Sequence, residues 1–202
     1  MNTCLRRLMM CVTGAVFASA AMAQQPIPPP VLKPFADNRD WVLMENLRYQ
    51  VGQTSTVIVV PRGFVTDFAS IPQAFWSFGL SAHGRYSKAA IVHDYLYWTQ
   101  GCSREQADNL LMIAMKESRV DAGERTLIFE GVRLGGSQPW LNNADERKRG
   151  LTRVLPERLL DFGPEVTWRD FRATLVPIID IRSDAPEIPA YCVLGNTTEV
   201  PQ

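Results

Sequence analysis

The sequence predicts an α+β fold, in which a small N-terminal antiparallel sheet packs on a bundle of about three helices and an extended C-terminal segment follows. Two observations predict it: residues 41–67 have a strand-like pattern, and residues 87–134 carry the capping signals and apolar stripes of helices. The 202 residues are long enough for one hydrophobic core and short for two. We therefore expect one core domain at residues 41–150, between a proline-rich linker (24–40) and a C-terminal extension (151–202) packed on the core.

The first 23 residues have the pattern of a signal peptide. Arg6 and Arg7 precede an apolar stretch at residues 8–21, and Ala21-Met22-Ala23 offers small residues for cleavage before Gln24. The stretch is shorter than the roughly 20 residues that span a bilayer. A buried N-terminal helix is the alternative. We expect an exported protein, either periplasmic or secreted.

Charge and cysteine content narrow the classes of function. The full chain has 21 basic and 21 acidic residues, and removal of residues 1–23 leaves 19 basic against 21 acidic. This balance gives no electrostatic support for binding nucleic acid. Cys102 and Cys192 are the cysteines left after cleavage, and in an oxidising compartment we expect them to form a disulfide. Two free, buried thiols are the alternative.

The strand-like region comes first. Residues 41–51 and 54–60 flank Gly52-Gln53, which indicates a hairpin, and residues 64–66 resemble a third short strand. Ser70-Ile71-Pro72-Gln73 has the form of a capping box that opens a short helix. Asp67 and Ser70 are either caps at this strand-to-helix connection or accessory site residues, as a metal ligand and a nucleophile.

Three helices are expected after this region. Ser87 caps the first, which runs to about Thr99, and Ser103 with Gln106 forms a capping box for the second, which runs to about residue 118. The second helix has an apolar stripe at helical spacing: Ala107, Leu110, Leu111, Ala114 and Met115. The third covers about residues 122–134 and stops at Gly135-Gly136. We expect a loop at residues 137–150 and a strand at residues 175–181.

One constellation could carry chemistry. His93 lies six residues before Thr99, about 9 Å along the first helix, and Asp108 lies five after Ser103, about 7.5 Å along the second. An antiparallel helix pair therefore brings them to nearly the same height, and Tyr97 shares the face of His93. A carboxylate on one imidazole nitrogen leaves the other free to take a proton. The alternative is a half-buried histidine in a purely structural network.

Two resemblances bear on identity. The stretches VPRGFVTDFASIP (60–72), GRYSKAAIVHDYLY (84–97) and ADNLLMIAM (107–115) resemble the bacterial and phage family called domain of unknown function 1353, DUF1353. That resemblance covers about residues 41–135 and implies no particular activity.

The second resemblance implies a mechanism. His93-Asp94-x-x-Tyr97, followed by Asp108 on the next helix, resembles the active site of secreted phospholipase A2 enzymes, the bacterial forms above all. The resemblance implies that His93 is the base, that Asp94 binds calcium, and that Asp108 and Tyr97 orient the histidine. The chain departs from that family in lacking the flanking cysteines of the animal enzymes and a clear glycine-rich calcium loop.

We therefore expect an exported hydrolase of phospholipase A2-like type, assisted by calcium and acting on envelope lipid esters, with membrane lipid or the cell envelope as its partner. A non-catalytic envelope-associated binding module and a cell-wall hydrolase are the alternatives. The sequence leaves the oligomeric state open.

Overall fold

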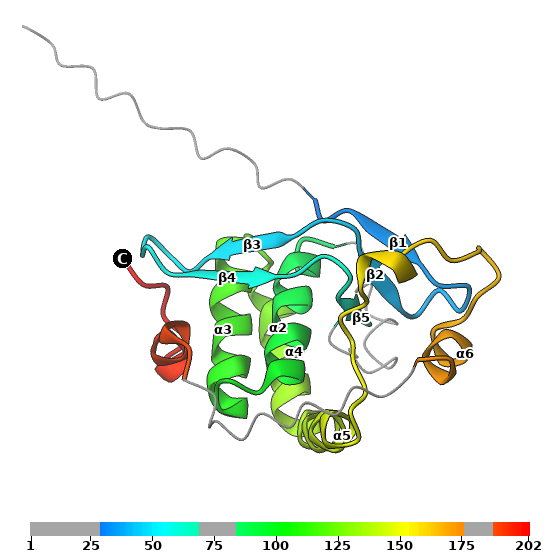
Figure 1. The fold of residues 1–202 in the computed structure, drawn as a ribbon. Coiled ribbons are helices and arrows are strands. Elements are labelled where there is room, and N and C mark those ends of the chain that lie inside the picture. The colour runs from blue at the N-terminus through cyan, green and yellow to red at the C-terminus, as the bar shows by residue number, and fades with distance from the viewer. Residues whose placement is uncertain (1–28, 69–83, 176–187) are drawn as a thin grey trace, which may run out of the picture.

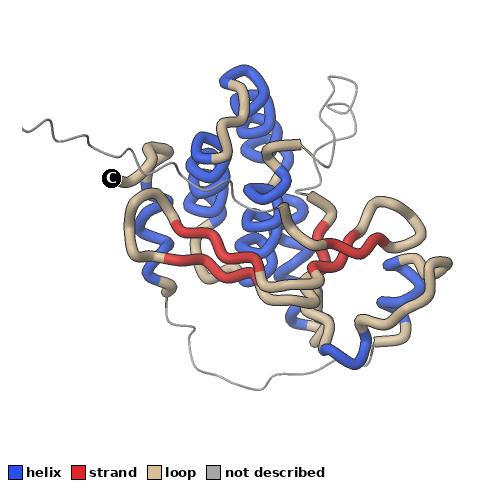
Figure 2. Tube along the Cα trace, turned by 90° about the horizontal axis from the view of Figure 1, so that it is seen from above, coloured by secondary structure: helices blue, strands red, loops and turns tan. Residues whose placement is uncertain are grey.

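The computed structural model describes residues 29–68, 84–175 and 188–202, and within them the α+β class is confirmed. Two small antiparallel sheets lie beside a group of helices (Figures 1 and 2). The strands are β1 (Leu32–Pro34), β2 (Trp41–Leu43), β3 (Leu47–Gln50), β4 (Val57–Val60) and β5 (Val65–Thr66). The helices are α2 (Ser87–Thr99), α3 (Arg104–Glu117), α4 (Ala122–Gly135), α5 (Ser137–Lys148) and α6 (Trp168–Ala173), with short 3-10 turns η1 (Glu157–Leu159) and η2 (Ala190–Asn196).

The strands divide between two sheets. The hairpin expected around Gly52 is confirmed as β3–β4, in which Leu47 pairs with Val60. The expectation of one continuous strand over residues 41–51 is wrong. Residues 44–46 leave the strand because the Asn46 side chain and the Met44 carbonyl accept hydrogen bonds from Arg62. As a result β2 joins a different sheet, ordered β1-β2-β5, and β1 forms inside the expected linker.

The helix boundaries follow local signals except at two places. The capping box of Ser103 and Gln106 is confirmed, and α4 ends at the expected glycines. Ser87, however, does not cap α2: the cap position is Tyr86, and the Ser87 hydroxyl donates to the Gly84 carbonyl instead. The loop expected at residues 137–150 is wrong, because most of these residues form α5.

Helix α5 is stabilised by docking on α2 rather than by an apolar stripe of its own. The Asn143 side chain donates to the Tyr97 carbonyl, Arg147 donates to the Thr99 carbonyl, and the Trp140 carbonyl accepts from Gln100. The first two bonds satisfy carbonyls at the end of α2, which a helix cannot satisfy internally, and the third ties the side chain after α2 to the backbone of α5.

The two sheets cover separate parts of the core. The hairpin packs on helices α2 and α3, and its inward residues join the stripe predicted for α3, all of which is buried. A second cluster, with Phe35, Val42 and Trp168 among its members, fills the space between the three-stranded sheet and α6. The short helix expected at Ser70 and nearly all of the strand expected at residues 175–181 lie outside the described residues.

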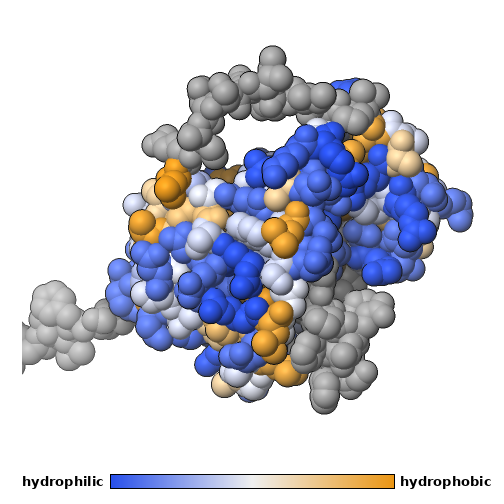
Figure 3. All heavy atoms as spheres, turned by 90° about the horizontal axis from the view of Figure 1, so that it is seen from below, coloured by the Kyte–Doolittle hydropathy of each residue, from blue (hydrophilic) through white to orange (hydrophobic). Residues whose placement is uncertain are grey.

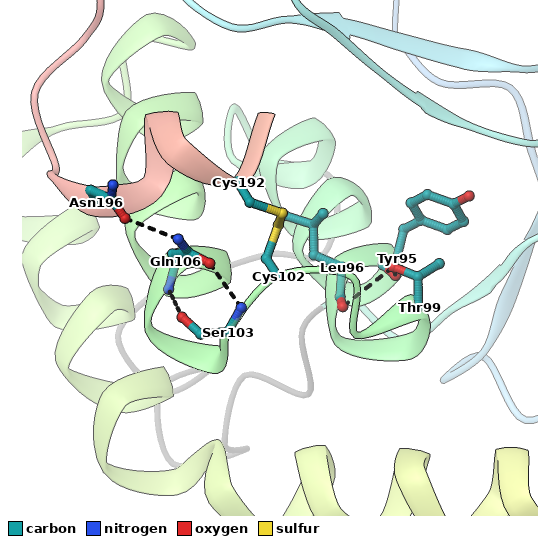
Figure 4. Close-up of a disulfide and its surroundings, with 8 residues drawn as sticks. All are labelled: Tyr95, Leu96, Thr99, Cys102, Ser103, Gln106, Cys192 and Asn196. Carbon is teal, nitrogen blue, oxygen red and sulfur yellow. Dashed lines mark hydrogen bonds between the residues drawn. A yellow bond between two sulfur atoms is a disulfide. The ribbon is translucent and has the colours of Figure 1, made fainter. Parts of the chain in front are cut away.

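The expected disulfide is confirmed between Cys102 and Cys192, whose Cα atoms are 5.2 Å apart (Figure 4). It joins the α2–α3 turn to η2. Nearby, Gln106 donates to Asn196, and Asn109 donates to the Gly195 carbonyl. The C-terminal turn is therefore held on α3 by covalent and polar contacts together. None of the helices within the described ranges is long and apolar enough to cross a membrane.

Candidate functional site

The α2–α3 hairpin brings His93 and Asp108 into direct contact, at the matched height that the spacing predicts. His93 Nε2 lies 2.9 Å from Asp108 Oδ1. Both residues are buried, with 2% of His93 and none of Asp108 exposed. The pair therefore lies in a low-dielectric setting, where hydrogen bonds are strong and unpaired polar atoms are costly.

Asp108 is the acceptor for two further groups. The Tyr97 hydroxyl donates to Oδ1 at 2.6 Å, and Arg104 Nη1 lies 3.2 Å from Oδ2 and 3.3 Å from the Arg133 carbonyl. An ionised carboxylate, which accepts only, satisfies all three donors. Burial, and then the hydrogen bond to Asp108, raise the pKa of the Tyr97 hydroxyl well above its usual range, which keeps it a donor.

This network fixes the tautomer of the histidine. With Asp108 accepting, the proton lies on Nε2 and Nδ1 carries a lone pair. Nδ1 is buried and has no hydrogen-bond partner in the part of the chain that the structure describes. Buried nitrogens are rarely left unsatisfied, so we expect Nδ1 to accept a hydrogen bond from a donor beyond the described residues, such as water or the hydroxyl group of a ligand.

His93 lines a cavity of about 220 Å³. Its walls come from α2, α4, α5 and the segments after β5 and α5, through Asp67, His93, Asp94, Tyr97, Gly131, Val132, Gly135, Gly136, Pro139, Asn142, Asn143, Glu146 and Arg153. Gly136 permits the close approach of the α4–α5 corner, because a Cβ there would lie 2.3 Å from the Tyr97 hydroxyl. The packing of the α4–α5 corner against α2 therefore shapes the cavity beside His93.

Asp94 lies on the side of α2 that faces β5. It is 9% exposed, and its Oδ2 accepts hydrogen bonds from the Thr66 hydroxyl and the Asp67 amide. The structure thus brings Asp67 and Asp94 to the cavity of His93, as it does Tyr97. Ser70 lies outside the described residues.

These donors do not make a calcium site by themselves. Ca²⁺ takes six to eight oxygen ligands, usually with several carboxylates. The described residues contain no group of three or more His, Cys, Asp or Glu that could hold a metal ion, and one Asp94 oxygen already accepts two hydrogen bonds.

A larger and more open cavity, of about 790 Å³, lies beside α5 and α6. Glu146 lines both cavities, and Asp40 lines the larger one. Burial, and then the charge of Asp67, raise the pKa of Asp40 to about 7. The charge of Asp67 therefore acts on Asp40, which couples the carboxylates of the larger cavity electrostatically to the site of His93.

Three residues of the site were not anticipated. Arg104 stands four residues before Asp108, a spacing that places oppositely charged side chains together on one helix and could have revealed the contact. Glu146 and Arg153 have no such local signal, because they reach the cavity through the packing of α5 and the segment after it.

The face of the molecule drawn in Figure 3 carries no broad apolar area in the part of the chain that the structure describes. In Figure 3, hydrophobic residues form small, separate groups on a mainly hydrophilic face. Two strongly exposed apolar side chains, Leu134 and Leu141, are close in sequence to Gly135, Gly136 and Pro139 of the cavity wall.

Comparison with known proteins gives one match. Residues 41–132 match the family described as "Protein of unknown function (DUF1353)". No curated protein and no solved structure matches the chain, so the phospholipase A2 resemblance gains no support there and stays a prediction. The match includes His93, Asp94, Tyr97 and Asp108 but ends before Arg153. It supports placing residues 41–132 in the DUF1353 family, in agreement with the sequence motifs.

Proposed function

We propose that this protein is an exported ester hydrolase of phospholipase A2-like type, in which His93 is the general base and envelope lipid esters are the substrates. One observation carries the proposal. His93 Nε2 is held by Asp108, while Nδ1 is buried, has no described partner and belongs to a residue that lines a cavity.

The chemistry follows from that arrangement. A water molecule donates to Nδ1, which takes its proton as the water oxygen bonds to the acyl carbon of the ester. Asp108 balances the positive charge that forms on the imidazole. When the tetrahedral intermediate collapses, the C–O bond to the alcohol breaks and the imidazolium returns its proton to the leaving oxygen. The products are an alcohol and a carboxylic acid, which ionises.

Calcium is the proposed cofactor from the resemblance, with Asp94 as its ligand. Bound calcium would supply Lewis-acid polarisation of the ester carbonyl. The described residues do not complete such a site, so dependence on calcium is a prediction to be tested with a chelator.

A second candidate function, a non-catalytic binding module, is supported by the burial of the His93–Asp108 pair. His93 is 2% exposed and Asp108 is fully buried, as expected of a structural network in a non-catalytic envelope-associated binding module. Under that reading, loss of the histidine lowers stability without removing any activity. Release of muropeptides from cell-wall preparations would favour the third possibility, a wall hydrolase.

The test uses the chain from residue 24 onward with vesicles of phosphatidylethanolamine and phosphatidylglycerol. Fatty-acid release is measured for wild type, His93→Gln and His83→Gln, each with calcium or with EDTA. We expect wild type and His83→Gln to release fatty acid and His93→Gln to release none. Absence of release from wild type, with a fall in the melting temperature of His93→Gln, would leave the structural reading.

A further inference from the structure

The cavity of His93 has a cation on its wall, contributed by Arg153. The backbone of Arg153 is fixed at the sheet, because its carbonyl accepts a hydrogen bond of 2.8 Å from the Val65 amide. Its guanidinium carbon lies 5.9 Å from the ring centre of Trp98, and 19% of its side chain is exposed. The guanidinium group is therefore partly desolvated and anchored.

Glu146 forms an ion pair with Arg153 but lies closer to Arg172. Glu146 Oε2 lies 2.6 Å from Arg172 Nη2 and 3.9 Å from Arg153 Nε. Arg153 Nε is buried and makes no hydrogen bond in the described parts of the chain. Apart from its long ion pair with Glu146, this buried donor is unsatisfied, which is costly and favours binding of an oxygen ligand in the cavity.

The charges around the cavity are unevenly placed. Asp67, Asp94 and Glu146 carry the negative charge of its wall, and Arg153 is the cation among the described lining residues. Thr66 and the Asp67 amide donate to Asp94, and Arg172 pairs with Glu146. Negative charge that develops on a ligand is therefore stabilised at Arg153 and disfavoured beside the aspartates.

We propose that Arg153 is the electrophile of this site: its guanidinium group binds the ester carbonyl oxygen and stabilises the oxyanion formed there. This inference rests on the proposed function and gives an arginine the role that calcium has in the resemblance. As the water oxygen bonds to the acyl carbon, the carbonyl π electrons move onto the oxygen at Arg153. They re-form the carbonyl when the alkoxide leaves and takes the proton from His93.

Arginine suits this role because its charge is permanent and its planar donors match two oxygens of a carboxylate or one developing oxyanion. The same contact would hold the product carboxylate. Because Asp67 and Asp94 repel that product, we expect weak binding, on the order of millimolar, which favours product release.

The first test measures binding without any need for turnover. In a His83→Gln background, His93 is the one remaining histidine, and its imidazole NMR signals report on the cavity at fixed pH. Hexanoate should shift these signals and 1-hexanol, its neutral analogue, should bind at least about tenfold more weakly. Arg153→Met should abolish the preference for hexanoate, Arg153→Lys should retain part of it, and the exposed Arg158→Met should leave it unchanged.

The second test is kinetic. Arg153→Met should lower kcat for fatty-acid release by about 10²- to 10³-fold with a smaller change in KM, as for loss of an oxyanion donor. Arg153→Lys should recover part of kcat, and melting temperatures verify that each variant is folded.

The two failures can be told apart. If wild type releases no fatty acid but binds hexanoate through Arg153, the carboxylate site stands and the hydrolase proposal fails. If wild type hydrolyses lipid and Arg153→Met does so equally well, the hydrolase stands and Arg153 is not its electrophile. Equal binding of hexanoate by Arg153→Met and wild type also overturns the inference.

Discussion

Replacement of Asp108 by Asn tests whether this carboxylate is the ionised centre of the buried network. Asp108 is fully buried and accepts from His93, Tyr97 and Arg104. In Asp108→Asn the side-chain carbonyl can still accept from His93 and Tyr97. Its NH2 group would face the Arg104 guanidinium, which is also a donor, so the third hydrogen bond is lost. Bonds to a charged acceptor contribute about 1.5–3 kcal/mol and neutral ones about 1 kcal/mol. Two weakened bonds and one lost bond therefore cost about 2–7 kcal/mol. This range allows for the 31% exposure of Arg104, which can turn to water.

Urea unfolding of Asp108→Asn measures that cost, with Asp145→Asn as the control. The Asp145 side chain is 66% exposed and pairs with Arg149 one helical turn away. An exposed pair of this kind contributes little, so the control should change the free energy of unfolding by less than about 0.5 kcal/mol. A loss below about 1 kcal/mol for Asp108→Asn would refute the ionised centre, because removal of a buried charge cannot be that mild with all three donors facing it.

Three further predictions concern the fold. Removal of the disulfide by Cys192→Ser should lower the free energy of unfolding by about 3–5 kcal/mol in chemical denaturation, because the bond closes a loop with a sequence separation of 90; a loss under 1 kcal/mol would show that the loop is not constrained by it. Asp40 has a folded-state pKa raised to about 7 by burial and then by Asp67, so the folded state keeps a proton that the unfolded state releases above about pH 4. Stability should therefore fall as pH rises from about 4 to 7. In Asp40→Asn the melting temperature should depend less on pH across this range, and a pH dependence equal to that of wild type would contradict the assignment. Gly195→Ala should lower the melting temperature, because its Cβ would lie 2.5 Å from a backbone oxygen of α3, whereas Gly163→Ala, whose Cβ meets open space, should not.

The core of the site could be predicted because it depends on short-range geometry. The capping box of Ser103 sets where α3 begins, and the turn before it is short. Counting residues along two paired helices therefore places His93 opposite Asp108, with Tyr97 one turn away on the same face. The disulfide was predictable because Cys102 and Cys192 are the two cysteines of the sequence beyond the expected signal peptide.

The rest of the fold could not be predicted because it depends on docking between distant segments. Helix α5 lacks an apolar stripe and is stabilised by side chains such as Asn143 and Arg147 that satisfy carbonyls of α2. The expected strand at residues 41–51 divides because Asn46 and Met44 bond to Arg62. Arg153 enters the cavity because its segment bonds to the edge of β5, a contact that no local pattern encodes.

The most direct measurement of the central claim is the initial rate of fatty-acid release from mixed phospholipid vesicles by wild type and by His93→Gln, under conditions where both are folded. A general base contributes about 10²- to 10⁴-fold to rate, so the account predicts a loss of at least about 100-fold for His93→Gln and none for His83→Gln. Equal rates for wild type and His93→Gln would contradict the account. So would a wild-type protein that releases no fatty acid while His93→Gln loses 1–3 kcal/mol of stability, about the cost of a broken buried hydrogen bond.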